Sequence, residues 1–491
     1  MKILFVASEL TPIAKVGGLG DVIGALPKAL SRLGIESEIV MPRYHFIPLK
    51  TLRLIKRGIK IQFAKTSEKI TLYQCALPKA NVKVFLIENR KYLSTGPGPY
   101  FESSGVAGMK KEIERFIFFS KAVFVLLRKQ ILKSDIIHAN DWHTGALVAL
   151  ARKSEIRNPE KGRGPLGTLR PKSETPKIIF TIHNLGNQGR WNVEEINQWF
   201  WSKNEKPIFK KFGNDYNLIA EGILNADWVT AVSPAYSREI LTREYGQGLE
   251  KIIQSRRRNL TGILNGIDYD FWNPQKDRFL SQTYSEKTAN LKSINKSVLQ
   301  RSLKLKNDLT LPLFGLVARL TDQKGIDLIT AGIKAFLKKY PSQFVFLGRG
   351  STDYETALLK LAKEFPQAVY TKIGFDEPLA HRIYAASDFF LMPSRFEPSG
   401  LGQMIAMRYG TIPVVRSTGG LKDTVRHLKT GFVFKHAKSE EFWQIAGLAW
   451  NYYLKHQEEL SVIQKNCFKE NFDFNRSARE YKNLYEKVLK L

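Results

Sequence analysis

One short segment, residues 392–403, places a carboxylate beside a glycine-containing turn, an arrangement that suits the binding of a charged ligand. Its apolar start predicts a buried strand, and Glu397 follows that strand in the turn. Ser399, Gly400 and Leu401 come next and open a predicted helix. The first N–H groups of a helix are unpaired and carry partial positive charge, and glycine lets an anion approach the backbone closely. The segment predicts an acid beside an anion site, although an ordinary strand–loop–helix turn with a capping acid fits it equally well.

A second predicted strand, residues 2–7, leads into a glycine-rich loop and an amphipathic helix. The loop contains Lys15, Gly17 and Gly18. Strand, glycine-rich loop and helix in this order form the layout of a phosphate cradle, in which Lys15 would be a mobile cation for a diphosphate. Glycine pairs are common in loops, so this pattern alone is a weak indication.

A third strand-end loop carries two cations, Arg319 and Lys324, just before another predicted helix. Taken alone, the two side chains could simply be solvated. Open α/β sheets bind ligands at the carboxyl ends of their strands, and all three loops lie at such ends. The three loops therefore predict an anion-binding site at this edge of the sheets. Together they favour a phosphorylated ligand.

Apolar strands alternate with helices over most of the chain, which is typical of parallel sheets covered by helices on both faces. The strands fall into two series, which a polar stretch from residue 265 to 311 separates. The predicted strands are residues 2–7, 36–41, 82–87, 135–138, 177–182 and 227–232, then 314–318, 343–347, 368–373, 388–392, 411–415 and 431–434. We therefore expect an α/β protein with two doubly wound, Rossmann-like domains facing a cleft.

The chain resembles the bacterial glycogen synthases, the starch-synthase-like family that transfers glucose from ADP-glucose onto α-1,4-glucan. No single matching segment is specific, but the set in this order is. The matching segments are residues 15–22, 138–143, 181–184, 232–236, 263–268, 272–274, 319–325, 393–398, 408–416 and 418–421.

The resemblance implies a GT-B fold with three parts. Residues 1–264 would form the acceptor-side domain, 265–311 an interdomain connection, and 312–475 the domain that binds the nucleotide sugar. A last helix, about 476–491, would return to pack on the first domain.

The resemblance also implies roles for particular residues in a retaining glucosyl transfer. Glu397 would orient the glucose hydroxyls and stabilise positive charge at C1, without acting as a covalent nucleophile. Arg319 and Lys324 would stabilise the leaving diphosphate, and His183 would line the sugar site with its ring or its carbonyl. The implied binding residues are Lys15, Gly17, Gly18, Asp141, Asn265, Ser399, Gly400, Leu401, Thr418 and Gly419.

Neither a metal nor another cofactor is expected. Asp268 and Asp270 form an Asp-x-Asp pattern of the kind that can hold a divalent cation, but they follow an Asn-Gly turn at the predicted domain junction, which favours a hinge. Lys15, Arg319 and Lys324 are cations that could neutralise a diphosphate without metal.

Composition fits a large enzyme. The 491 residues are enough for two or three domains, and two cysteines exclude a disulfide framework. The apolar start is too short for a signal peptide, and Lys121 interrupts the longest apolar run, 116–127, which predicts a buried helix instead of a membrane span. We therefore expect a cytoplasmic protein without a membrane partner. Nothing in the sequence indicates an oligomeric state.

The net charge of +30 raises the alternative of nucleic-acid binding. The basic residues are spread along the chain, however, and no zinc-finger spacing or RNA-binding aromatic strand is present, so nucleic acid is not expected as a partner. Residues 152–177 are rich in Lys, Arg and Pro without apolar periodicity, which predicts a flexible basic surface loop. The expected partners are ADP-glucose and α-1,4-glucan.

Two other function classes stay open: a GT-B glycosyltransferase that uses UDP-glucose or another acceptor, and a non-catalytic glucan- or nucleotide-binding relative. Intact Lys15, Arg319, Lys324 and Glu397 argue against the latter. Departures from the family pattern include serine at 399, where the family often has cysteine. The others, near residues 94–97, 186–188 and 220–222, fall in the first domain, so the resemblance bears more directly on the donor than on the acceptor.

Overall fold

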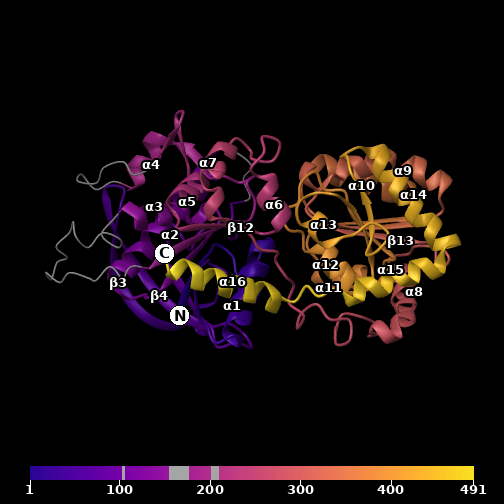
Figure 1. Cartoon of the computed structure of the whole chain (residues 1–491), viewed down its shortest axis with the longest axis horizontal. Helices are drawn as coiled ribbons and strands as arrows, with labels where there is room; N and C mark the ends of the chain where they lie inside the picture. The colour runs from indigo at the N-terminus through magenta and orange to yellow at the C-terminus, as the bar shows by residue number, and fades with distance from the viewer. Residues whose placement is uncertain (102–105, 154–175, 201–209) are drawn as a thin grey trace. The chain divides into compact units, whose positions relative to one another are not determined.

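The computed structural model describes residues 1–101, 106–153, 176–200 and 210–491. These residues form two compact units, Met1–Ile263 with Phe474–Leu491 (unit 1) and Leu264–Asp473 (unit 2). Figure 1 shows unit 1 in indigo to magenta, with the last helix in yellow, and unit 2 in orange to yellow. Most of the basic segment 152–177 lies outside the described residues.

Unit 1 is built on a nine-stranded sheet with the order β12-β11-β7-β6-β1-β2-β5-β4-β3. The chain starts in the middle with β1, adds β2 and β5 on one side, and then returns to add β6 on the other. The strands are β1 (Lys2–Val6), β2 (Glu36–Pro42), β3 (Arg53–Phe63), β4 (Thr66–Ala76), β5 (Lys83–Glu88), β6 (Ile136–Asn140), β7 (Lys177–Ile182), β11 (Trp228–Ala231) and β12 (Leu260–Gly262). A small sheet of β8 (Arg190–Asn192), β10 (Asp215–Asn217) and β9 (Lys211–Phe212) accompanies it.

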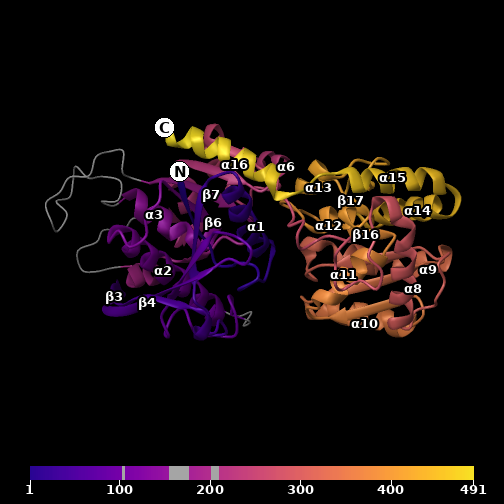
Figure 2. The same cartoon turned by 90° about the horizontal axis from the view of Figure 1, so that it is seen from below.

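Helices cover both faces of the large sheet because successive residues of its strands point to opposite sides. Leu4 and Val6 of β1 join the core formed with α2, α3 and α5, whereas Ile3 and Phe5 join the core formed with α1 and α16. Figure 2 shows α16 beside α1, although the two lie at opposite ends of the chain. The helices of unit 1 are α1 (Gly18–Arg32), α2 (Val106–Arg128), α3 (Gly145–Lys153), α4 (Val193–Phe200), α5 (Leu218–Asn225), α6 (Pro234–Glu239), α7 (Glu250–Ser255) and α16 (Phe474–Leu489).

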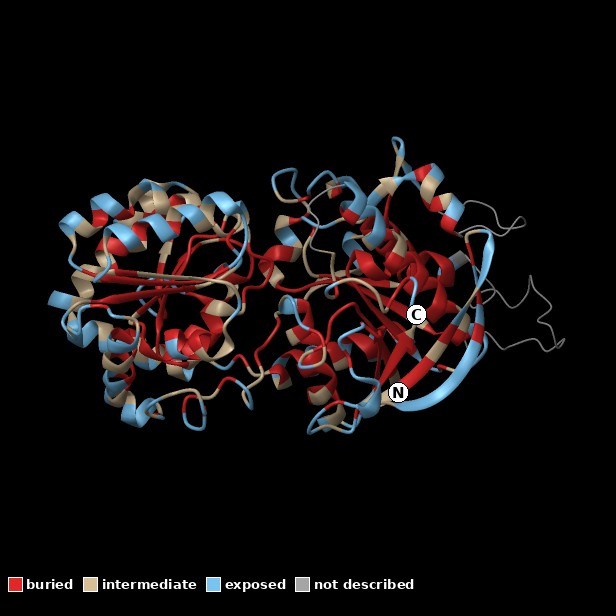
Figure 3. Cartoon of the chain, turned by 180° about the vertical axis from the view of Figure 1, so that it is seen from behind, coloured by how far each residue is buried: buried red, intermediate tan, exposed pale blue. Residues whose placement is uncertain are grey.

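Unit 2 contains a six-stranded parallel sheet with the order β15-β14-β13-β16-β17-β18. Here too the chain starts in the middle: β14 and β15 extend the sheet on one side of β13, and β16 begins the other. The strands are β13 (Leu313–Val317), β14 (Gln343–Gly348), β15 (Val369–Ile373), β16 (Phe389–Met392), β17 (Ile412–Arg416) and β18 (Phe432–Phe434). Figure 3 shows buried strands flanked by helices whose outer faces are exposed.

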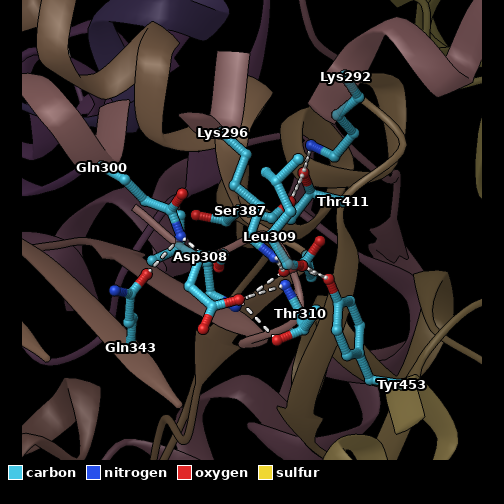
Figure 4. A network of polar contacts seen from close by, with 12 residues as sticks. Lys292, Lys296, Gln300, Asp308, Leu309, Thr310, Gln343, Ser387, Thr411 and Tyr453 are labelled. Carbon is cyan, nitrogen blue, oxygen red and sulfur yellow. Dashed lines mark hydrogen bonds and ion pairs between the residues drawn. The ribbon is translucent and has the colours of Figure 1, made fainter. Parts of the chain in front are cut away.

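The helices of unit 2 pack on two apolar cores, a large one that includes α9 and α14 and a smaller one formed by α8 and α11. Lys292 and Lys296 of α8 point into the unit, where Figure 4 shows their polar network with Thr411 and Tyr453. The helices are α8 (Lys292–Ser302), α9 (Ile326–Lys339), α10 (Thr352–Glu364), α11 (Glu377–Ala386), α12 (Gly402–Arg408), α13 (Gly419–Thr424), α14 (Ser439–Lys455) and α15 (Gln457–Lys469).

The predicted α/β class with two doubly wound parallel sheets is confirmed, and each of the twelve predicted strands corresponds to a strand of the structure. The sequence did not predict the antiparallel β3–β4 hairpin or the small sheet in unit 1. Residues 265–311, predicted as a connection, belong to unit 2 by their contacts, and so does Leu264. One reason is that the buried α8 lies within this stretch.

Candidate active site

The centre of the unit 2 sheet brings two predicted site residues into direct contact. β13 and β16 are neighbours, and the chain leaves β13 toward one side of the sheet and β16 toward the other. Open α/β sheets bind ligands at such a switch point. The lysine loop (residues 318–325) follows β13, and the glutamate loop (residues 393–401) follows β16.

Lys324 and Glu397 form an ion pair between these two loops. The distance from Lys324 Nζ to Glu397 Oε2 is 2.5 Å, and the side chains are only 18% and 7% exposed. Ser394 Oγ donates a second hydrogen bond to the same oxygen at 2.9 Å. Among the residues that the structure describes, Glu397 Oε1 accepts no hydrogen bond, so this oxygen is the one available to a ligand.

The backbones of the two loops lie close together at Gly325. Gly325 has a φ of +68°, and a Cβ atom at this position would lie 2.2 Å from the carbonyl oxygen of Pro393. Only glycine fits such a conformation and such an approach. Arg319, in the same lysine loop, is exposed and donates from Nη2 to Gln323 Oε1 at 3.2 Å. The loop thus offers one paired and one exposed cation.

The predicted anion-binding turn at residues 399–401 precedes α12, which begins at Gly402 with Leu401 as its N-cap. Gly400 has a φ of +66°. The side-chain amide of Gln403 donates to the carbonyl oxygens of Ser399 and Gly400, at 3.1 and 3.0 Å. The buried Ser399 hydroxyl has no hydrogen-bond partner in the described part of the chain.

The loop after β17 joins the same group of strand ends. Thr418 is fully buried and is the N-cap of α13, which begins at Gly419. The next residue, Gly420, donates its backbone N–H to the carbonyl oxygen of Glu397 at 3.0 Å. Asn265, also predicted as a site residue of unit 2, is 6% exposed, and its Oδ1 is buried without a hydrogen-bond partner in the described part of the chain.

In unit 1 the corresponding switch point lies between β1 and β6. The loop after β1 carries Lys15, Gly17 and Gly18. Glu9 organises this loop, since its Oε2 accepts the N–H groups of Val16 at 2.8 Å and Gly17 at 2.7 Å. The Gly17 N–H, expected to bind phosphate, is therefore used by a carboxylate of the protein itself.

Lys15 is also paired within unit 1. Its Nζ lies 2.7 Å from Asp21 Oδ1, and both side chains are about one quarter exposed, at 27% and 23%. Tyr100 donates to the other Glu9 oxygen at 2.6 Å. The predicted Lys15 loop is thus held by two carboxylates, of which Glu9 is buried.

Asp141 and His183 are neighbours at the ends of β6 and β7. Asp141 Oδ1 accepts the backbone N–H groups of His183 at 3.1 Å and Asn184 at 3.4 Å. Burial raises the pKa of the Asp141 carboxyl to about 7, although these two hydrogen bonds act to lower it. The backbone of Asp141 is strained, with a φ of +57° and a ψ of −179°, which is typical of functional positions.

The ring of His183 is neutral at physiological pH because burial lowers its pKa to about 3. Its Nε2 lies 2.9 Å from Asn140 Oδ1. The Asn140 amide nitrogen donates to the carbonyl oxygens of Val6 and His138, which identifies Oδ1 as an acceptor. The His183 proton is therefore on Nε2, and Nδ1 is an acceptor. An imidazole that is neutral at physiological pH suits sugar binding better than proton transfer.

Three residues at these strand ends were not predicted from the sequence. Glu9 was not assigned a role because its contacts with Val16, Gly17 and Tyr100 depend on the folded loop. Ser394 was seen only as part of a motif. Phe375, which follows β15, is 82% exposed; the strand prediction shows that a phenylalanine follows the strand, but its exposure is known only from the structure.

Within the described residues, no cluster of three or more His, Cys, Asp or Glu side chains could hold a metal ion. Asp268 and Asp270, weighed above as a metal pattern, lie in a turn in which the Asp268 carboxylate accepts the Asp270 N–H at 2.8 Å. None of the helices in the described part of the chain is long and apolar enough to cross a membrane.

Comparison with known proteins gives matches over both units. Residues 2–255 match the family model of the starch synthase catalytic domain, and residues 301–451 match that of glycosyl transferases group 1. The glycogen synthases of Thermosipho africanus and Thermotoga maritima are 38% and 36% identical, over 100% of this chain and 99% of theirs. The catalytic domain of starch synthase IV from Arabidopsis thaliana, solved bound to ADP and acarbose, is similar with a TM-score of 0.87 and 32% identity, covering 100% of this chain and 99% of that one.

Proposed function

The chain belongs to the family of glycogen and starch synthases, and we propose that it transfers glucose from ADP-glucose to the non-reducing 4-hydroxyl of an α-1,4-glucan, with retention of configuration at C1. The observation that carries this proposal is the buried Lys324–Glu397 pair at the switch point of unit 2. It combines a cation for a leaving phosphate with a carboxylate for a developing positive charge.

On the donor side, the reaction creates two charges that the unit 2 loops can stabilise. As the C1–O bond breaks, negative charge grows on the distal phosphate of ADP, and Arg319 and Lys324 stabilise it. The Lys324 ammonium has three donors, so it can keep Glu397 while it binds a phosphate oxygen. The backbone N–H groups of residues 399–401 add further donors. The Thr418 N–H, predicted to do the same, already donates to the Arg416 carbonyl oxygen at 3.0 Å.

Positive charge develops at C1 of the transferred glucose. Glu397 Oε1 faces this charge and accepts from a glucose hydroxyl, while Oε2 stays with Lys324 and Ser394. The acceptor hydroxyl attacks from the face that the phosphate leaves, and the departing phosphate accepts its proton. Glu397 forms no bond to C1 in this sequence of events.

Unit 1 carries further groups that suit this chemistry. Lys15 is a cation that can bind a phosphate in exchange for Asp21. His183 and Asp141 bind hydroxyls of the transferred glucose or of the acceptor glucan, with His183 Nδ1 accepting a hydrogen bond.

Phe375 of unit 2 offers its exposed ring for stacking with the adenine base.

A direct assay tests the proposal. The protein is incubated with a maltooligosaccharide and radiolabelled ADP-glucose or UDP-glucose, with and without EDTA, and the product linkage is determined by NMR. We expect α-1,4 chain extension from ADP-glucose that survives EDTA. Transfer only from UDP-glucose would favour the alternative donor, and loss of activity that Mg²⁺ restores would contradict the metal-free mechanism. Absence of transfer from either donor would contradict the proposed function itself.

A further inference from the structure

A second ion pair in unit 2 connects α9, the helix that follows the lysine loop, to the glutamate loop. Arg395 Nη1 and Nη2 each lie 2.6 Å from one oxygen of Asp327, which is in the first turn of α9. Two parallel N–H···O bonds of this kind fix the orientation of the guanidinium as well as its position. We call this pair the Arg395–Asp327 clamp.

The backbone around the clamp is held from both sides. The Arg395 N–H donates to the carbonyl oxygen of Gln323 at 2.8 Å, and Arg395 Nη1 donates to that of Asp322 at 3.0 Å. On the opposite side, Arg416 of β17 donates to the carbonyl oxygens of Ser394, at 2.8 Å, and Arg395. The short segment before Glu397 is therefore fixed against both the lysine loop and β17.

The clamp lies near the surface of unit 2. Both side chains are more than one third exposed, at 38% and 37%, and solvent weakens the attraction between exposed charges. The side-chain hydrogen bond with Arg395 lowers the pKa of Asp327, so the pair is charged at neutral pH. A bidentate pair close in sequence to Lys324 on one side and to Glu397 on the other points to a role in geometry.

We propose that Arg395 and Asp327 are positioning residues, which set the angle at which Glu397 Oε1 faces the reacting sugar and hold Lys324 against Oε2. This inference rests on the proposed function, because its effect is on the glucosyl transfer step. The clamp side chains act on the reaction only through Glu397 and Lys324.

The test begins with two substitutions that keep the size of each side chain. Asp327→Asn and Arg395→Lys each remove the bidentate geometry. We expect each to lower kcat by roughly 10-fold, since misplacing a reacting group by ~1 Å can cost ~100-fold. KM for the nucleotide sugar should change by less than about threefold, and a melting curve should show that each variant stays folded at the assay temperature. The matched control is Lys334→Met, which removes an ion pair with Glu364 of equal length, 2.6 Å, between α9 and α10.

The decisive measurement repeats Asp327→Asn in a Glu397→Gln/Lys324→Ala background. If the clamp acts only through these two residues, Asp327→Asn should lower the residual kcat there by less than about twofold. An equal fall of kcat in both backgrounds would overturn the proposal, and so would wild-type kcat in both single variants. If the unmodified protein transfers glucose from neither ADP-glucose nor UDP-glucose, the proposed function fails and the clamp's role fails with it. Wild-type transfer with an unimpaired Asp327→Asn variant overturns the clamp alone.

Discussion

Glu397 presents its two carboxylate oxygens to different surroundings, and this asymmetry defines what each neighbour contributes. Lys324 and Ser394 both bind Oε2, and the backbone of Glu397 is held by the Gly420 N–H. A charge fixed in this way needs no reorganisation when the transition state forms, which is the main advantage of a preorganised site.

The first prediction concerns Glu397 and Lys324. Glu397→Gln and Lys324→Ala should each lower kcat by roughly 10²–10³, the usual effect of deleting a preorganised charge stabiliser. KM for ADP-glucose should change less, because the charges on phosphate and C1 grow only as the bond breaks. Steady-state kinetics in each folded variant measures both, with Glu364→Gln on the surface of the same unit as the control. Near-normal turnover in either variant would remove these residues from the mechanism.

The second prediction concerns the free energy of unfolding that is lost when the buried Asp141 carboxyl ionises. Because the pKa of Asp141 is raised to about 7 from an ordinary value of 3.8, the folded chain holds a proton between these pH values that the unfolded chain has lost. The stability contributed by Asp141 is present below about pH 4 and is lost as the pH rises through 7. Asp141→Asn should therefore gain stability relative to the unmodified chain as the pH rises from 4 to 8.

Denaturant unfolding at several pH values measures this difference, with Asp215→Asn, a half-exposed residue, as the control. Asn can still accept the two backbone N–H groups, since both bind Oδ1. Glucosyl transfer should fall in the same variant, because function commonly requires groups that cost stability. If the difference in unfolding free energy between the two proteins does not depend on pH, the pKa of Asp141 is not raised in the folded chain.

A site residue could be predicted from the sequence only where the residues around it in the chain indicate its role. Glu397, Lys324 and Lys15 follow apolar strands and precede helices, so their position at a ligand-binding edge can be inferred without a structure. Glu9 and Ser394 could not be predicted, because each acts through a hydrogen bond to an atom whose position depends on the loop conformation.

At the scale of elements, strands buried on both faces were easy to predict because they form continuous apolar runs. The outer β3–β4 hairpin was missed for the opposite reason. One face of β3 buries Ile59, Ile61 and Phe63, but Lys60 and Gln62 between them are exposed, so the strand has no apolar run. The polar stretch 265–311 gave no sign of its packing in the same way: Lys292 and Lys296 lie within it, and both are buried.

The third prediction concerns α8, which these lysines fasten to the rest of unit 2. Lys292 Nζ donates to the Ala385 carbonyl oxygen and to Thr411 Oγ1, both at 2.6 Å, and burial lowers its pKa from 10.5 to about 7. Between these pH values the unfolded chain holds a proton that the folded chain lacks, so stability rises with pH. Lys292→Met has no titrating group at this position, so its stability lacks this dependence on pH.

Relative to Lys292→Met, the unmodified chain should gain roughly 3 kcal/mol between pH 7 and 9.5, at about 1.4 kcal/mol per pH unit. Urea unfolding of both proteins across this range measures the gain. The lysine's hydrogen bonds produce a pH-independent offset, so only the slope is diagnostic. Lys334→Met, on the surface of α9, should show no such slope. A flat difference for Lys292→Met would mean that the ammonium stays charged in the folded chain, compensated by Asp388.

At the scale of the whole molecule, the chain ends in the unit in which it begins. α16 follows unit 2 in sequence but packs with α1 in unit 1, and Tyr481, Tyr485 and Val488 join the core there. Tyr485 OH lies 2.8 Å from Nδ1 of the buried His138, whose Nε2 lies 2.6 Å from Thr181 Oγ1. This chain of contacts reaches from the end of the sequence to β6 and β7, the strands that carry Asp141 and His183.

The last prediction tests this dependence of unit 1 on the end of the chain. Tyr485→Ala should destabilise unit 1 by about 3–5 kcal/mol, as other large-to-small core substitutions of aromatic residues do. Tyr485→Phe keeps the ring but leaves His138 Nδ1 without its partner, which should cost about 1–3 kcal/mol. Lys482→Ala, on the exposed face of the same helix, should change stability by less than about 0.5 kcal/mol. Hydrogen exchange followed by peptide mass spectrometry locates the effect: amide protection should fall in residues 1–263 and stay unchanged in 264–473. Loss of protection confined to α16 itself would show that unit 1 folds without this helix, and that the sites at β6 and β7 do not depend on the end of the chain.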